Sequence, residues 1–264
     1  MKKAIPIEFI YQVFSLLIAI IIVHAVYVAV IRPNASAFME REIALMKADS
    51  EYVQQRSIFV VVRDFEQEAC FILALWAFSI MGYKGYASVR ERKLLDTLVD
   101  GEDDDADSVL DTGKLSMRLD SLPHRAREGL LPRALGAALH RISVTGNVQD
   151  VSAAAREVCQ VESDRLESEL SIIRYIAWAI PSIGFIGTVR GISDALAQAH
   201  RAVEGDITGV TQSLGVAFNS TFVALAISIV VMFFVYQLQL AQERVVLDTE
   251  TFCDRYLVRR LKPL

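Results

Sequence analysis

The sequence is poor in the residues that build metal, disulfide and enzymatic sites. Among its 264 residues are three cysteines and four histidines, and Cys70, Cys159 and Cys253 lie far apart without CxxC or Cys/His spacing. A disulfide framework or a structural metal site is therefore not expected. The chain also has no GxSxG, HExxH or P-loop motif and no carboxylate pair placed for catalysis near a membrane surface. These absences argue against an enzyme, and no cofactor or metal is predicted.

The chain also has no excess of basic over acidic residues. The chain has 27 Lys and Arg against 32 Asp and Glu, which gives a net charge of -5. A nucleic-acid partner is not expected, because it would require a basic face. Hydrophobic residues make up 53% of the chain, and the mean hydropathy is +0.35. Since soluble domains contain about 45–50% apolar residues, this composition indicates a membrane protein.

Four segments are long and apolar enough to cross a lipid bilayer, which takes about 20 residues. The predicted spans are residues 9–31, 69–86, 172–192 and 214–238. The first run follows Lys2 and Lys3, as in a signal peptide. It is too long for the apolar core of a signal peptide, and no small-residue cleavage motif ends it. We therefore interpret residues 1–31 as an N-terminal segment with a retained membrane helix.

The distribution of basic residues predicts the orientation, because Lys and Arg are in excess on the cytoplasmic side. Such residues precede the first predicted span and follow the second and the fourth: Lys2, Lys3, Lys84, Arg90, Arg92, Lys93, Arg244, Arg255, Arg259, Arg260 and Lys262. This pattern places both termini in the cytoplasm. Residues 87–171 and 239–264 are then cytoplasmic, and residues 32–68 and 193–213 form periplasmic loops.

The segments between the spans carry helical patterns as well. Apolar residues near helical spacing within 37–53 predict an amphipathic helix in the first outer loop. The acidic run at 101–108 favours a solvated linker, with docking of a partner as the alternative. Asn147 can cap a helix, and the apolar face that follows it continues into the third span, as the fourth span continues into the tail. The predicted fold is all-α, with four transmembrane helices and long helical cytoplasmic extensions.

Polar residues inside the spans are functional candidates, because in lipid they need a partner or water. The third span holds Thr188 among small residues and a helix-bending proline, and the fourth holds three hydroxyls and an amide: Pro181, Gly184, Gly187, Gly191, Asn219, Ser220, Thr221 and Ser228. Gly187 and Gly191 form a GxxxG motif, which allows helices to approach closely. A threonine hydroxyl can hold water or receive a protonated carboxyl group. Alternatively, these hydroxyls bond to their own helix and only assist packing.

The third span also carries a family signature. Residues 179–192, AIPSIGFIGTVRGI, resemble the A-P-x-I-G-(L/F)-(L/F)-G-T-V-x-G-I motif of the MotA/TolQ/ExbB proton channel family. Residues 214–228 are similar to the family's last span, in which a second threonine recurs, and the resemblance covers roughly residues 148–260. Val216 departs from TolQ- and ExbB-like chains, which have glutamate there, and Arg190 departs from the usual apolar residue. Arg190 either reaches the outer membrane interface or supplies a charge at the channel mouth.

The resemblance implies a channel or stator subunit of a motor in the bacterial inner membrane, driven by H⁺ or Na⁺. It also implies a homo-oligomer, a ring of five, around a single-span MotB/TolR/ExbD-like partner whose membrane aspartate faces Thr188 and Thr221, with Ser228 and Asn219 on the ion path. The predicted spans contain no acidic residue, and His24 is their sole candidate for a proton carrier. A histidine in such a span more often packs or forms hydrogen bonds at a helix interface. A structural scaffold without ion conduction remains the alternative.

Overall fold

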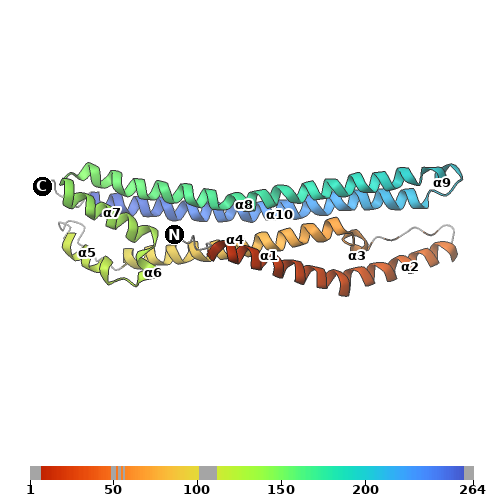
Figure 1. Cartoon of the computed structure of the whole chain (residues 1–264), viewed down its shortest axis with the longest axis horizontal. Helices are drawn as coiled ribbons and strands as arrows, with labels where there is room; N and C mark the ends of the chain where they lie inside the picture. Colours follow the sequence, from red (N-terminus) through yellow and green to blue (C-terminus); the bar gives the residue numbers. More distant parts are fainter. Residues whose placement is uncertain (1–6, 49–51, 53–54, 56, 101–111, 259–264) are drawn as a thin grey trace, which may run out of the picture. The chain divides into compact units, whose positions relative to one another are not determined.

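The computed structural model describes residues 7–48, 52, 55, 57–100 and 112–258 (Figure 1). Every regular element in these residues is helical, which confirms the predicted all-α fold. The long helices are α1 (Ile7–Val26), α2 (Arg32–Ala48), α4 (Phe65–Asp100), α8 (Val148–Ala197) and α10 (Thr208–Cys253). The shorter ones are α3 (Ile58–Val61), α5 (Thr112–Ser121), α6 (His124–Arg127), α7 (Leu130–Thr145), α9 (Ala199–Val203) and the π-helical turns η1 (Tyr27–Ile31) and η2 (Asp254–Val258).

Four helices of the described residues are long and apolar enough to cross a membrane, as predicted. They cover Glu8–Leu45, Phe65–Thr97, Val148–Ala197 and Thr208–Tyr256, and each contains one predicted span. Some residues used in the sequence analysis lie outside the described part of the chain: Lys2, Lys3, the acidic run at 101–108, Arg259, Arg260 and Lys262.

The first helix extends well beyond its predicted span. The elements α1, η1 and α2 follow one another without a break from Ile7 to Ala48. Pro33 would break a regular α-helix here, because its ring clashes with the carbonyl group of Ala29, four residues earlier. Ala29 lies within the π-helical turn, and this wider turn is a known way to accommodate such a conflict. The helix expected in the outer loop therefore continues directly from the first span.

The helices α8 and α10 are each much longer than a membrane crossing, as the sequence indicates. The helix α8 has 50 residues and α10 has 46, which corresponds to about 75 and 70 Å at 1.5 Å per residue. The Asn147 side chain accepts a hydrogen bond of 3.0 Å from the amide of Gln149 and so caps the start of α8, as predicted. The two helices run side by side, with α9 in the connection between them (Figure 1).

The contacts within the chain divide it into two units. The span unit comprises Met1–Met81 and Ile172–Val235, and the extension unit comprises Gly82–Ser171 and Tyr236–Leu264. In the extension unit, α7 packs on α8 and α10 around an apolar core. Core residues from five helices include Leu95, Leu115, Leu135, Val151 and Val246. This core gives the extension unit the interior of a soluble helical domain.

The interior of the span unit combines alanines with larger apolar residues such as Ile80 and Ile180, and large apolar residues also cover its outer faces. Its buried positions include Ala74, Ala77, Ala177, Ala217 and Ala224. More than half of the surface of several large apolar side chains is exposed, among them Phe14, Ile21, Phe185, Phe222 and Ile229. Small residues between helices and large apolar residues on the outer faces are typical of membrane helices, since lipid accommodates the outer faces.

Candidate functional site

Two threonine hydroxyls meet between α8 and α10. The hydroxyl oxygens of Thr188 and Thr221 are in hydrogen-bond contact. Thr188 Oγ1 also lies 3.0 Å from the carbonyl oxygen of Ala217 on α10, and Thr221 Oγ1 lies 3.0 Å from the carbonyl oxygen of Gly184 on α8. Each threonine therefore bonds to the backbone of the opposite helix. Thr188 Oγ1 also lies 3.4 Å from the carbonyl oxygen of Gly184 on its own helix, so its contacts involve both helices.

The hydrogen bonds of this pair leave it with the properties of an acceptor. Each hydroxyl has one hydrogen to donate and two lone pairs that accept. The two hydrogens have three acceptors within reach, namely the carbonyl oxygens of Ala217 and Gly184 and the other hydroxyl. When one threonine donates to the other, only one of the two carbonyl oxygens receives a hydrogen, and both hydrogens are still used within the group. The lone pairs that remain can accept a hydrogen bond from an arriving group. Both side chains are half-buried rather than sealed, so the pair lies at an accessible edge of the helix–helix contact.

The glycines of α8 explain why the helices come so close. A Cβ at Gly187 would lie 2.5 Å from the Cβ of Ser220, and one at Gly191 would lie 2.7 Å from the Cβ of Ala217. Real Cβ atoms essentially never approach so closely. Gly184 meets Ala224 in the same way. The three predicted packing glycines therefore all face α10, at the level of the threonine pair and around it.

Ser228 contacts the part of α8 where Pro181 removes one backbone hydrogen bond, although the helix continues through the proline. Proline has no amide hydrogen, so the carbonyl oxygen of Ala177, four residues earlier, lacks its helical partner. The hydroxyl of Ser228 on α10 donates to this oxygen at 3.1 Å. Ser228 shares a helix face with Thr221, but it lies about 10 Å further along α10 at 1.5 Å per residue. Its contacts are those of a residue that repairs the backbone of the neighbouring helix.

Asn219 does not join the hydroxyl cluster formed by Thr188 and Thr221. It lies two residues before Thr221 on α10 and is half-buried. Residues two apart on a helix point in different directions, so Asn219 faces away from Thr188. The structure therefore brings together Thr188 and Thr221, places Ser228 on the same face of α10 at a different level, and separates Asn219 from all three.

A group of ion pairs at the start of α4 was missed by the sequence analysis. Glu66 accepts hydrogen bonds of 2.7 and 2.9 Å from Arg190 on α8. Glu68 accepts one of 2.7 Å from His24 on α1 and one of 2.5 Å from Arg32 on α2. Arg190 is thus the partner of a carboxylate, and His24 bonds between helices as its usual role suggests. A signal was available, since acidic residues favour the first turn of a helix.

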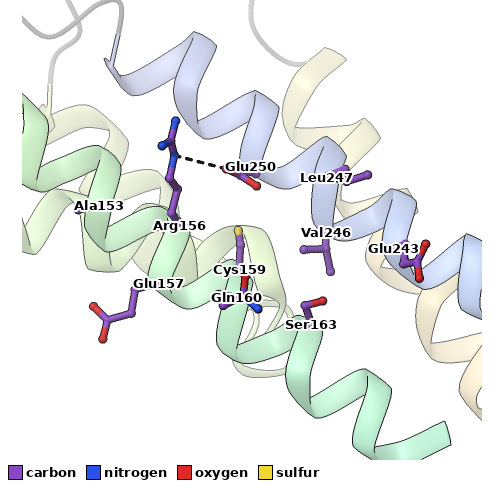
Figure 2. A pocket seen from close by; sticks show the side chains of 10 residues that line it. All are labelled: Ala153, Arg156, Glu157, Cys159, Gln160, Ser163, Glu243, Val246, Leu247 and Glu250. Carbon is purple, nitrogen blue, oxygen red and sulfur yellow. Dashed lines mark ion pairs between the residues drawn. The ribbon is translucent and has the colours of Figure 1, made fainter.

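The extension unit contains a groove between α8 and α10 (Figure 2). Its volume is about 600 Å³, and the lining residues are Ala153, Arg156, Glu157, Cys159, Gln160, Ser163, Glu243, Val246, Leu247 and Glu250. Arg156 and Glu250 form an ion pair of 3.4 Å at its edge. Burial raises the pKa of the Cys159 thiol to about 11, and the same cause raises the pKa of Cys253 to about 12. Both thiols are therefore protonated at neutral pH and are poor nucleophiles.

The paired helices α8 and α10 correspond to a known family of membrane proteins. Residues 127–251 match the MotA/TolQ/ExbB proton channel family. The matched segment contains all of α8, nearly all of α10 and both threonines. The family resemblance inferred from the signature is thereby confirmed. No curated protein and no solved structure gives a significant match to the chain. The match covers a little less than half of the chain. The family generally consists of ion-channel-type motor subunits, and the four apolar helices agree with a membrane protein.

Proposed function

We propose that this chain is the channel or stator subunit of a membrane motor that couples H⁺ or Na⁺ flow to mechanical work. The observation that carries the proposal is the contact of Thr188 with Thr221 within the segment matched to the family. Two half-buried hydroxyls from two membrane helices form a polar point between them. Such a point requires a polar partner or water inside the membrane.

The partner in this proposal is a single-span subunit of the MotB/TolR/ExbD type, with an aspartate at the level of the threonine pair. The predicted spans of this chain contain no acidic residue, and Glu66 and Glu68 at the start of α4 are held in ion pairs. In this proposal the ionisable group is therefore supplied by the second protein. The lone pairs of the threonines accept a hydrogen bond from a protonated carboxyl group. A deprotonated carboxylate is an acceptor only and finds no donor there. Protonation therefore favours the approach of the aspartate, and deprotonation favours its release.

This difference between the two protonation states provides the mechanical step. Protonation from the outer side brings the aspartate to the threonine pair, and loss of the proton to the cytoplasm frees it to move to the next subunit. One charge that crosses a potential of 100 mV supplies about 2.3 kcal/mol. This energy exceeds thermal energy several-fold, so a few such transfers can drive a step. No covalent chemistry takes place on the chain, which is therefore not an enzyme.

The assembly that suits this mechanism is a homo-oligomer, a ring of five, in the inner membrane with both termini in the cytoplasm. The large apolar side chains on α8 and α10, such as Phe185 and Phe222, are available for lipid and for neighbouring copies. Basic residues at the inner ends of the spans, such as Arg90 and Arg244, suit the cytoplasmic side. A closed ring is the common way for identical subunits to assemble.

A structural scaffold without ion conduction is the second candidate. It is favoured by the same hydroxyls, because both threonine hydrogens find acceptors within the pair and on the backbone of the opposite helix. Native mass determination of the complex that co-purifies with the tagged chain separates the two. A ring of this chain with copies of a single-span, aspartate-bearing protein supports the motor. A ring without such a protein, or a monomer, contradicts the motor and leaves the scaffold.

A further inference from the structure

Gln67 is a buried polar residue that the mechanism above does not use. It lies in the first turn of α4 and is 0% exposed. Its amide nitrogen donates to the carbonyl oxygen of Val61 at 3.1 Å and to Ser220 Oγ at 3.3 Å. Its amide oxygen is buried and has no hydrogen-bond partner. Buried oxygens without partners are rare, and such an oxygen often marks a place where water or an ion binds.

Ser220 connects Gln67 to the threonine pair. Ser220 is 1% exposed, directly precedes Thr221 in the chain, and accepts the hydrogen bond from Gln67. A Cβ at Gly187, the residue before Thr188, would lie 2.7 Å from Ser220 Oγ and 3.0 Å from the Cγ of Glu66. The start of α4 and the hydroxyl cluster are therefore neighbours, with glycine leaving room for both.

Other unpartnered oxygens belong to the same end of the span unit. In the described part of the chain, four buried side-chain oxygens or nitrogens lack a hydrogen-bond partner, and three of them are Tyr27 Oη, Asp64 Oδ2 and Gln67 Oε1. Tyr27 lies within electrostatic range of Asp64. The carboxylate and amide oxygens can only accept, so they require a hydrogen-bond donor or a cation. The carboxylates of Glu66 and Glu68 are already occupied by arginine and histidine partners.

We propose that Gln67 positions the permeating cation on the outer side of the threonine pair. In this inference, which rests on the proposed function, the free amide oxygen of Gln67 receives the cation, and Ser220 leads it toward Thr188 and Thr221. The cation is small and monovalent, a hydronium ion or Na⁺, because both are bound by neutral and anionic oxygens. The two hydrogen bonds of the amide nitrogen hold the oxygen in position. Gln67 is thus a positioning residue that determines conductance without any change in its own charge.

The test uses the full chain in complex with its co-purified native membrane partner, reconstituted into lipid vesicles. Proton flux is measured with a pH-sensitive dye and Na⁺ flux with a Na⁺-sensitive dye, so the two cations are distinguished. Gln67→Met keeps the length of the side chain and removes the oxygen together with the two hydrogen bonds of the amide nitrogen. Gln242→Met is the matched control, because Gln242 is also buried, 3% exposed, and has an unpartnered amide oxygen, but belongs to the extension unit.

We expect Gln67→Met to reduce flux of the permeant cation at least about tenfold, the effect of losing one hydrogen bond to a charged group. Its subunit composition should remain that of the unmodified complex, although its melting temperature should fall because two buried hydrogen bonds are lost. Gln242→Met should conduct within about twofold of the unmodified complex. Gln67→Glu, which retains the oxygens, should restore flux and make it depend on pH.

Three results would overturn the inference. Normal flux in Gln67→Met would show that the amide oxygen takes no part in conduction. A parallel loss of flux and of assembly, without rescue by Gln67→Glu, would show a purely structural role. An unmodified complex that assembles with its partner but conducts neither cation would refute the proposed function itself, and this inference would fall with it.

Discussion

Ser228 on α10 donates its hydroxyl to the carbonyl oxygen that Pro181 leaves without a partner in α8. The proline and the serine are thus linked through Ala177, although they lie on different helices. This arrangement keeps α8 helical through the proline, because the freed carbonyl group is satisfied from outside. Ser228, which the sequence analysis placed on the ion path, has a direct structural explanation.

The link between Pro181 and Ser228 predicts that substitutions at these two positions have non-additive effects on the free energy of unfolding. Ser228→Ala should lower the free energy of unfolding by about 1 kcal/mol, because the carbonyl oxygen of Ala177 loses its donor. In a Pro181→Ala background residue 181 regains an amide hydrogen for that oxygen, so Ser228→Ala should cost less than about 0.5 kcal/mol. Thermal unfolding in detergent of the two single variants and the double variant measures the difference. Equal costs in both backgrounds would disprove the link.

The glycines of α8 that face α10 predict that the effect of a Gly→Ala substitution on stability depends strongly on where the glycine lies. Gly187→Ala should destabilise the span unit by about 1–3 kcal/mol, since its Cβ would lie 2.5 Å from that of Ser220 and would force α8 and α10 apart. Gly215→Ala is the matched control, because a Cβ at Gly215 on α10 meets nothing within 4 Å. It should leave stability unchanged or raise it slightly. Melting temperatures of the two variants test this, and similar losses for both would contradict the close contact.

The stability of the extension unit should depend on pH through the ionisation of Glu169. Burial raises the pKa of this carboxyl group, but hydrogen bonds and charge from Lys84 and Arg165 outweigh burial and hold the pKa below its usual value of 4.5. Both contacts measure 2.8 Å, and Lys84 is buried. Because the pKa is lower in the folded state, this stabilisation is complete above pH 4.5 and is lost as the pH falls through the folded-state pKa.

The measurement is thermal unfolding in detergent as a function of pH on the acid side of neutrality. Glu169→Gln should have a lower melting temperature near pH 7, because it removes a charge next to buried Lys84, and it should lose less on acidification than the unmodified chain. Glu157→Gln, an exposed position on α8, serves as the control and should keep the full acid dependence. An unchanged acid dependence in Glu169→Gln would show that other groups cause it.

The sequence was sufficient for the parts of the fold that follow from local pattern. Four apolar runs predicted four crossing helices, since the thickness of a bilayer fixes the length that each needs. The continuation of α8 from Asn147 was visible because the cap and the apolar face are both local. The family signature pointed to Thr188 and Thr221, and the structure places their hydroxyls in contact.

The parts that escaped prediction depend on contacts between segments far apart in the chain. Glu66 and Arg190 are separated by 124 positions, so their pairing has no local signal. Gln67 stands just outside the predicted second span, and only its burial against Ser220 makes it conspicuous. The first helix passes Pro33 through a π-helical turn, which is a local adjustment that helix propensity does not reveal.

The central claim is that ions pass by way of the threonine pair, and flux through the reconstituted complex with its native partner tests it most directly. Thr188→Val and Thr221→Val keep the shape of the side chain and remove the hydroxyl. Thr249→Val is the control, because the hydroxyl of Thr249 is buried and bonds to its own helix at Val245. We predict that the first two variants assemble with the partner but lose flux at least about tenfold, whereas Thr249→Val conducts normally. Normal flux in both Thr188→Val and Thr221→Val, with the partner bound, would contradict the account.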